Sequence, residues 1–195
     1  MFLLARPSAA AIDVVIVAQR DRTFSYAEVG ASRGPAPAGY TVDHNRVLIG
    51  VGADAFARAR RALDEWGMFA LGWCAIHPPR PPIAPGVDVA AVIRHFGFWS
   101  INVSRIVYRL DEDDGVVRRS GFAYGTLPEH GEIGEERFSV EWDRRDDRVH
   151  YDLYAFSKPG QLLARLGYPI GRMLQRRFGR DSRRAMVEAV RVDAG

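Results

Sequence analysis

Residues 136–142 read Glu-Arg-Phe-Ser-Val-Glu-Trp, and along this stretch large apolar residues alternate with polar ones. In a β-strand, successive side chains point to opposite faces of the sheet. Phe138, Val140 and Trp142 therefore share one face, which we expect to be buried. Arg137, Ser139 and Glu141 share the other, wetter face. The pattern predicts a half-buried strand at residues 135–142.

Four other stretches have the composition of strands, and polar connectors separate them. They span residues 88–96, 101–110, 119–126 and 148–156. The connectors at residues 111–115 and 143–147 have the length of hairpin turns, so neighbouring strands should pair antiparallel. Two shorter strands are expected earlier, at residues 47–51 and 73–77, and the prolines between residues 78 and 85 require a loop.

Two helices are expected to cover this sheet. Residues 53–68 place apolar side chains at three- and four-residue spacing, which predicts a helix with one apolar face. In a second, C-terminal helix an apolar stripe runs from Leu162 to Phe178, with arginines elsewhere around the helix. Pro169 lies inside this stripe and would remove a backbone hydrogen bond, so we expect a kink or a break near Tyr168.

The N-terminal residues form an arm in this interpretation. Residues 8–20 could form a helix capped by Ser8, whereas the β-branched run from Val14 to Val17 favours a strand, and we prefer the helix. Residues 30–39 have the composition of a loop. We expect a single α+β domain over residues 1–195, with an arm and loop at 1–40, a helix-bearing antiparallel sheet at 41–158 and a C-terminal helix at 159–190.

The composition is that of an ordinary globular protein, with 47% hydrophobic and 26% charged residues among 195. No stretch approaches the apolar length needed to cross a bilayer. Arg6 and Pro7 end the N-terminal apolar run too early for an export signal, and the lone Cys74 cannot form an internal disulfide. These features predict a cytoplasmic location, and they do not indicate an oligomeric state.

Positive charge is concentrated near the C-terminus. Residues 160–190 contain seven arginines against Asp181 and Glu188, a charge of +5, whereas the rest of the chain contributes −2 to the net charge of +3. A basic segment can bind nucleic acid or an anionic membrane surface. A solvated, arginine-rich helix face explains the same pattern more simply, so we expect neither nucleic acid nor a membrane as the main partner.

The segment from Tyr124 to Arg137 is the densest in titratable side chains. Within it, His130, Glu135 and Tyr124 are the candidates for general acid–base catalysis. Imidazole titrates near neutral pH, and a neighbouring carboxylate can fix its tautomer. Connections between strands are polar by default, which explains the same density without catalysis.

A metal site is an alternative use of the same histidine. His130 could approach Glu132 or Glu135, with His95 or His150 contributed by neighbouring strands. The five histidines are scattered, however, and no spacing such as His-Glu-x-x-His occurs. We therefore expect no metal and no cofactor.

Two arginines in the stretch 101–110 could bind an anionic group. Arg105 and Arg109 should share the face opposite Ile106 and Tyr108, and on a concave face their guanidinium groups could clamp a ligand. On a convex face they would be solvated. The other ligand-binding candidates are Tyr108, Phe122, Arg137, Trp142, Asp152 and Tyr154. The aromatic residues among them would line either a filled core or an apolar pocket.

Five short strings in the chain carry a family resemblance. They are Phe-Ser-Tyr-Ala-Glu-Val-Gly at 24–30, Leu-Gly-Trp at 71–73, Phe-Ala-Tyr-Gly-Thr-Leu-Pro-Glu-His at 122–130, Gly-Glu-Glu-Arg-Phe at 134–138 and Leu-Ala-Arg-Leu-Gly-Tyr-Pro at 163–169. They resemble the uncharacterised protein family number 0548, a bacterial and plant domain of unknown function. The order of elements also resembles the START-like helix-grip superfamily, in which a curved antiparallel sheet wraps around the last helix. That resemblance implies a ligand cavity between sheet and helix.

Three functions follow as expectations. The first is a binding protein that holds a small hydrophobic or amphipathic molecule between the sheet and the C-terminal helix. The second is a cyclase- or hydrolase-like enzyme that uses the same cavity, with acid–base residues around His130. The third is contact with nucleic acid or a membrane surface through the arginine-rich helix.

Overall fold

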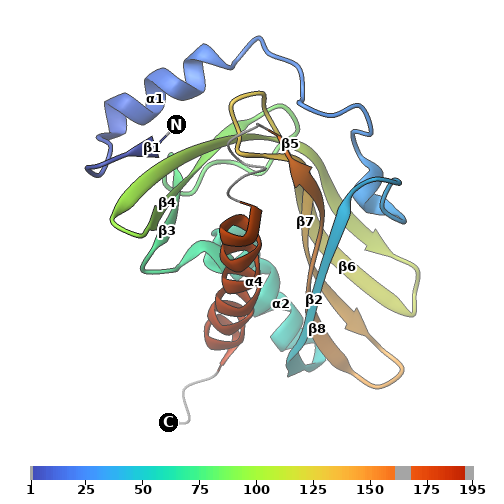
Figure 1. Cartoon of the computed structure of the whole chain (residues 1–195). Helices are drawn as coiled ribbons and strands as arrows, with labels where there is room; N and C mark the ends of the chain where they lie inside the picture. Colours follow the sequence, from blue (N-terminus) through green and yellow to red (C-terminus); the bar gives the residue numbers. More distant parts are fainter. Residues whose placement is uncertain (1, 161–167, 192–195) are drawn as a thin grey trace.

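The computed structural model describes residues 2–160 and 168–191 of the chain. Within these residues eight antiparallel strands form one curved sheet in the order β2-β8-β7-β6-β5-β4-β3, and β1 pairs with β5 (Figure 1). The strands span Phe2–Leu3 (β1), Thr41–Val51 (β2), Cys74–His77 (β3), Asp88–His95 (β4), Phe98–Asp113 (β5), Val117–Thr126 (β6), Glu132–Asp143 (β7) and Arg148–Pro159 (β8). The α-helices in this part of the chain are Ala9–Ala18 (α1), Gly52–Asp64 (α2) and Tyr168–Val190 (α4).

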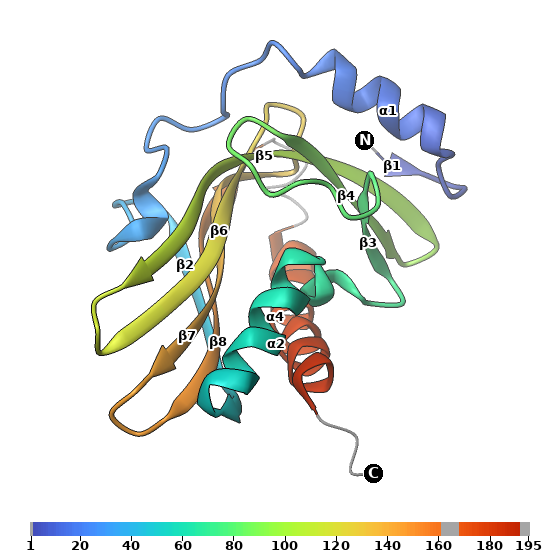
Figure 2. The same ribbon diagram turned by 180° about the vertical axis from the view of Figure 1, so that it is seen from behind.

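The hollow of the sheet holds α2 and α4, which pack side by side on its concave face (Figures 1 and 2). The strands present a continuous core to these helices, in which Phe122, Phe138 and Tyr151 are fully buried. Phe56 and Leu63 of α2 complete this core. Removing so much apolar surface from water is the main stabilising contribution to such a layered fold. The predicted fold class, a curved antiparallel sheet around a long C-terminal helix, is confirmed.

The alternation that predicted a strand at residues 135–142 is also present. Phe138 and Val140 are fully buried on the concave face. Arg137 and Glu141 lie on the opposite, convex face, where Arg137 binds Asp152 and Glu141 binds Arg46. One strand therefore contributes apolar side chains to the concave core and charged side chains to the convex face.

A β-bulge at Val107 changes the faces of β5. The pairing of β5 with β6 shifts register between Ile106 and Tyr108, as happens where one strand contains an extra residue. Ile106 therefore packs in the concave core, whereas Tyr108 and Leu110 pack on the convex side. Strict alternation along β5 fails at this point.

The N-terminal arm lies on the convex face. α1 is capped by Ser8, whose Oγ accepts a hydrogen bond of 3.2 Å from the Ala11 amide, so the preferred helix is confirmed. α1 packs over β4 and β5 through Ile12 (Figure 2). Residues 19–40 then cross the outer surface of the sheet to reach β2 (Figure 1).

Several strands are longer than predicted, whereas α2 is shorter and ends at Asp64 rather than at residue 68. β2 begins at Thr41 rather than at residue 47, and β5 continues to Asp113. Part of the predicted final helix lies outside the described residues, namely the apolar positions 162, 163 and 166. The break expected near Tyr168 falls at their edge. No helix in residues 2–160 and 168–191 is long and apolar enough to cross a membrane.

Candidate functional site

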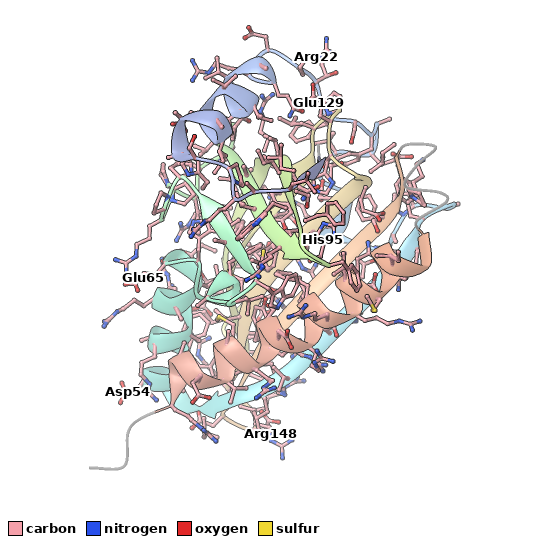
Figure 3. All side chains as sticks on the ribbon, turned by 60° about the vertical axis from the view of Figure 1, so that its left-hand side comes forward. Arg22, Asp54, Glu65, His95, Glu129 and Arg148 are labelled. Atoms are coloured by element: carbon pink, nitrogen blue, oxygen red, sulfur yellow. The ribbon has the colours of Figure 1, made fainter. Side chains whose placement is uncertain are left out.

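A cleft of about 790 Å³ lies between the β4–β5 hairpin and one side of α4. We call it the rim cleft. Its hairpin side consists of His95 and Phe96, and its α4 side consists of Arg172, Met173, Leu174, Arg176, Arg177 and Arg180. His95, at the end of β4, lies beside α4 (Figure 3). The cleft thus joins two segments that are far apart in the sequence.

The tip of the β4–β5 hairpin presents an aromatic ring to the rim cleft. His95 pairs with Phe98, so Phe96 and Gly97 form a two-residue turn. Both residues have positive φ, 48° and 81°, as a type I′ hairpin turn requires, and such a φ is uncommon for phenylalanine. The Phe96 side chain is 64% exposed. Its ring therefore contributes little to the core.

The space directly between the sheet and the middle of α4 is filled by aromatic rings. The ring of Phe178 lies 5.0 Å from that of Phe69 and 6.3 Å from that of Phe138, centroid to centroid. Phe69 and Phe138 are themselves 5.7 Å apart. These are ordinary packing distances for aromatic side chains. At this level the helix packs on a solid core, and the open space lies at the rim.

The arginines on the α4 side of the rim cleft differ in their partners. Arg172 forms a two-point ion pair with Asp43 of β2. Arg177 stacks on the ring of Trp73 at 4.3 Å and lies 3.5 Å from Asp181, which also pairs with Arg180 at 3.0 Å. The four arginines are the only charged groups that line the cleft within the described residues when His95 is neutral. Burial lowers the pKa of His95, which keeps it neutral at physiological pH.

A second group of interest lies deeper on the concave face, where the Tyr124 hydroxyl donates a hydrogen bond of 2.6 Å to Glu136. Burial raises the pKa of the Glu136 carboxyl from 4.5 to about 7, although the bond from Tyr124 acts in the opposite direction. Burial also raises the pKa of Tyr124 and that of the nearby Cys74 thiol. A carboxyl that titrates near neutrality can donate or accept a proton at physiological pH.

The catalytic candidate Glu135 lies on the other side of the sheet from Tyr124. Its carboxylate accepts hydrogen bonds from the Tyr26 hydroxyl at 2.6 Å, the Gly30 amide at 2.7 Å and the Ser32 amide at 2.9 Å, and from the Ser32 hydroxyl. All of these donors belong to the N-terminal arm. Glu135 therefore anchors the arm to the convex face.

His130 is apart from both of these residues, in the turn between β6 and β7. Its Nδ1 lies 3.0 Å from the backbone nitrogen of Glu132 and accepts that N–H. Burial lowers the pKa of His130 to about 4, so the imidazole is neutral at physiological pH. The structure does not bring His130, Glu135 and Tyr124 together, and catalysis by His130 stays a prediction.

Glu135 was expected from the sequence as an acid–base residue, whereas Glu136 was not. The alternation at residues 136–142 already placed Glu136 on the same face as Phe138. An acidic residue on the apolar face of a strand was the signal that could have identified it.

The predicted arginine clamp is wrong. Arg105 lies on the convex face, where it binds Asp88 at 2.6 Å and the Arg20 carbonyl of the arm at 2.6 Å. Arg109 lies on the concave side and binds Asp64 of α2 at 2.8 Å. The bulge at Val107 separates the two guanidinium groups, which the expected alternation had placed on one face.

The remaining ligand-binding candidates are also divided between the two faces. Asp152 on the convex face binds Arg137 at 3.1 Å and His44 at 2.7 Å, and Arg137 lies over the ring of Tyr154 at 5.2 Å. Tyr108 binds the Ser32 hydroxyl at 2.7 Å beneath the arm. On the concave side Phe122 is fully buried and Trp142 packs against Phe56. None of them lines the rim cleft.

A metal was not expected from the sequence. Across residues 2–160 and 168–191, no three His, Cys, Asp or Glu side chains are grouped so that they could hold a metal ion.

A curved antiparallel sheet that grips a C-terminal helix and leaves a cleft beside it defines a helix-grip protein. The hypothetical protein jhp0584 from Helicobacter pylori has the same fold, with a TM-score of 0.52 and 12% identity over 77% of this chain and 88% of that one. The chain belongs to the family described as "Domain of unknown function (DUF1990)", whose model matches residues 25–185.

Two relatives that match this chain over nearly their whole length support the family membership. The UPF0548 protein of Dictyostelium discoideum is 34% identical over 208 residues, which cover 97% of this chain and 96% of the relative. The UPF0548 protein of Deinococcus radiodurans is 35% identical over 202 residues, 97% of this chain and 98% of the relative. The family resemblance seen in the sequence is confirmed, and the family is found in a eukaryote as well as in a bacterium.

Proposed function

We propose that the protein binds a small hydrophobic or amphipathic molecule in the rim cleft, between the edge of the sheet and the C-terminal helix. The observation that carries this function is a cleft of about 790 Å³ in which exposed apolar side chains lie beside arginines. Phe96 is 64% exposed and Met173 is 47% exposed. Ligand pockets commonly have volumes of roughly 300–1,000 Å³. An apolar ligand would remove these side chains from water, which favours binding.

The proposed ligand site lies further out than the space between sheet and helix that was expected from the sequence. A molecule between the sheet and the helix would have to displace the rings of Phe69, Phe138 and Phe178, which are in mutual contact. Opening such a packed core is costly. The rim cleft needs no such displacement.

Nile red, a neutral dye whose fluorescence rises in apolar surroundings, tests this site. The wild-type protein should bind it saturably with one-to-one stoichiometry. Replacing both Phe96→Asn and Met173→Ser should raise the Kd at least about tenfold, because two apolar contacts are lost. Asparagine tolerates positive φ, so the hairpin turn should be kept.

A matched control removes exposed apolar side chains from elsewhere on the molecule. Leu4 and Val14 of the N-terminal arm are 82% and 69% exposed. Replacing both with serine should leave the Kd for Nile red unchanged. Absence of saturable binding to the wild type, or an equal loss in the control, would contradict the proposed function.

A second candidate function is acid–base catalysis, which one observation favours. The hydrogen-bonded pair of Tyr124 and Glu136 lies on the concave face, and burial raises the pKa of Glu136 to about 7. The rate at which the protein hydrolyses p-nitrophenyl butyrate should then change as the pH passes through 7. Glu136→Gln should abolish this hydrolysis, and the exposed-site control Glu129→Gln should retain it. Equal rates in all three proteins would rule out this chemistry for the ester.

A further inference from the structure

The charges along the rim cleft are unbalanced. Arg176, Arg177 and Arg180 line it, and the carboxylate that pairs with them within the described residues is Asp181, which is shared between Arg177 and Arg180. The Arg176 side chain forms no ion pair or hydrogen bond with the described residues. Three guanidinium groups with one carboxylate leave an excess of two positive charges.

Spacing along α4 concentrates this excess. Arg172, Arg176 and Arg180 follow one another at intervals of four residues, so they lie on one side of the helix. Like charges at this spacing repel each other. The positive charge of Arg172 is balanced, because its guanidinium group forms an ion pair with Asp43. Arg180 shares Asp181 with Arg177, and the Arg176 side chain has no acidic partner within the described residues. An anion bound there would therefore reduce the repulsion between Arg176 and Arg180.

On α4, the apolar residues Met173 and Leu174 of the rim cleft come directly before its basic part, Arg176, Arg177 and Arg180. Phe96 adds a further apolar side chain from the hairpin. Arg172, which precedes Met173, is paired with Asp43. Seven residues of α-helix from Met173 to Arg180 span about 10 Å. A ligand that matches both parts has an apolar chain and a charged end.

We infer, on the basis of the proposed function, that the molecule bound in the rim cleft is a single-chain amphiphile with an anionic head group, a carboxylate or a phosphate monoester. Arg176 and Arg180 bind the head group, with Arg177 held beside them by Trp73. Phe96 and Met173 contact the apolar chain. Guanidinium groups suit both head groups, because their paired N–H donors match the paired oxygens of a carboxylate or a phosphate.

Displacement of Nile red by ten-carbon compounds tests the head group at constant chain length. Decanoate and decyl phosphate should displace the dye at concentrations at least about tenfold lower than decanol, and decyltrimethylammonium should be weaker than decanol. Inorganic phosphate alone should not displace the dye. Displacement by inorganic phosphate at the concentrations at which decyl phosphate acts would overturn the amphiphile assignment in favour of a free anion.

Paired arginine variants locate the head-group site. Replacing both Arg176→Gln and Arg180→Gln should bring the ratio between the displacing concentrations of decanol and decanoate close to one. Replacing both Arg184→Gln and Arg191→Gln removes the same charge outside the cleft and should keep the ratio. A preference for decanoate that survives in the first pair overturns the inference.

The outcomes separate the two proposals. If Nile red and decanol bind but decanoate has no advantage in the wild type, the anionic head group is refuted and the apolar site stands. If neither the dye nor any ten-carbon compound binds, both are refuted.

Discussion

Replacing Glu136 with glutamine should stabilise the protein increasingly as the pH rises from 5 to 8. The carboxyl lies on the concave face and accepts a hydrogen bond from Tyr124. Burial raises its pKa from 4.5 to about 7 in the fold. Glutamine has the same shape and can still accept this hydrogen bond, but it does not ionise.

The direction of the effect follows from proton binding in the two states. Between pH 4.5 and about 7 the folded protein holds a proton on Glu136 that the unfolded chain has released. The free energy of unfolding therefore falls as the pH rises through this range and is constant above it. At about 1.4 kcal/mol per pH unit, the difference between the two pKa values corresponds to about 3 kcal/mol. The variant should recover most of this amount at pH 8 and little of it at pH 5.

Urea unfolding followed by tryptophan fluorescence measures the effect in both proteins at pH 5, 6, 7 and 8. The difference in free energy of unfolding between Glu136→Gln and wild type should increase from pH 5 to pH 7 and then level off towards pH 8. The exposed residue Glu129 provides the control, because Glu129→Gln should give a difference that does not depend on pH. A difference for Glu136→Gln that stays constant from pH 5 to pH 8 would refute a buried, neutral carboxyl at this position.

Three further predictions concern the arm and the core. Glu135→Gln should lower the free energy of unfolding by about 2–3 kcal/mol, because the amide nitrogen that replaces one carboxylate oxygen cannot accept the hydrogen bonds that the arm donates to it; limited proteolysis should then cut residues 19–40 faster than in wild type. Gly125→Ala places a methyl group against the Tyr26 hydroxyl; it should cost about 1–3 kcal/mol in urea unfolding, and unchanged stability would contradict the close contact. Cys74 is buried and its pKa is raised by burial, so Ellman's reagent should label it only as the protein unfolds; rapid labelling in native buffer would show an open site.

The local elements were predictable because their signals lie between near neighbours in the chain. A polar residue before an apolar run predicted the cap at Ser8, and the structure places its Oγ on the Ala11 amide. Alternation over seven residues predicted that Phe138 and Val140 of β7 are buried, which is confirmed; Ser139, expected on the wetter face, is buried as well. These patterns depend on the two-residue period of a strand and on the geometry of a helix end, and neither requires knowledge of the rest of the fold.

The candidate site was not predictable in the same way, because its parts meet only after folding. One extra residue at Val107 moved Arg109 away from Arg105, and a bulge has no signal in periodicity. The register of β6 with β7 brought Tyr124 to Glu136 rather than to Glu135.

The sequence by itself determined an α+β chain with antiparallel strands, an arginine-rich final helix and membership of its family. Only the tertiary structure decided where the open space lies. Phe178 fills the centre of the concave face against Phe69, while the turn at Phe96 faces the arginines of α4. The physical reason is that packing between distant segments decides which apolar residues are buried and which remain exposed to bind another molecule.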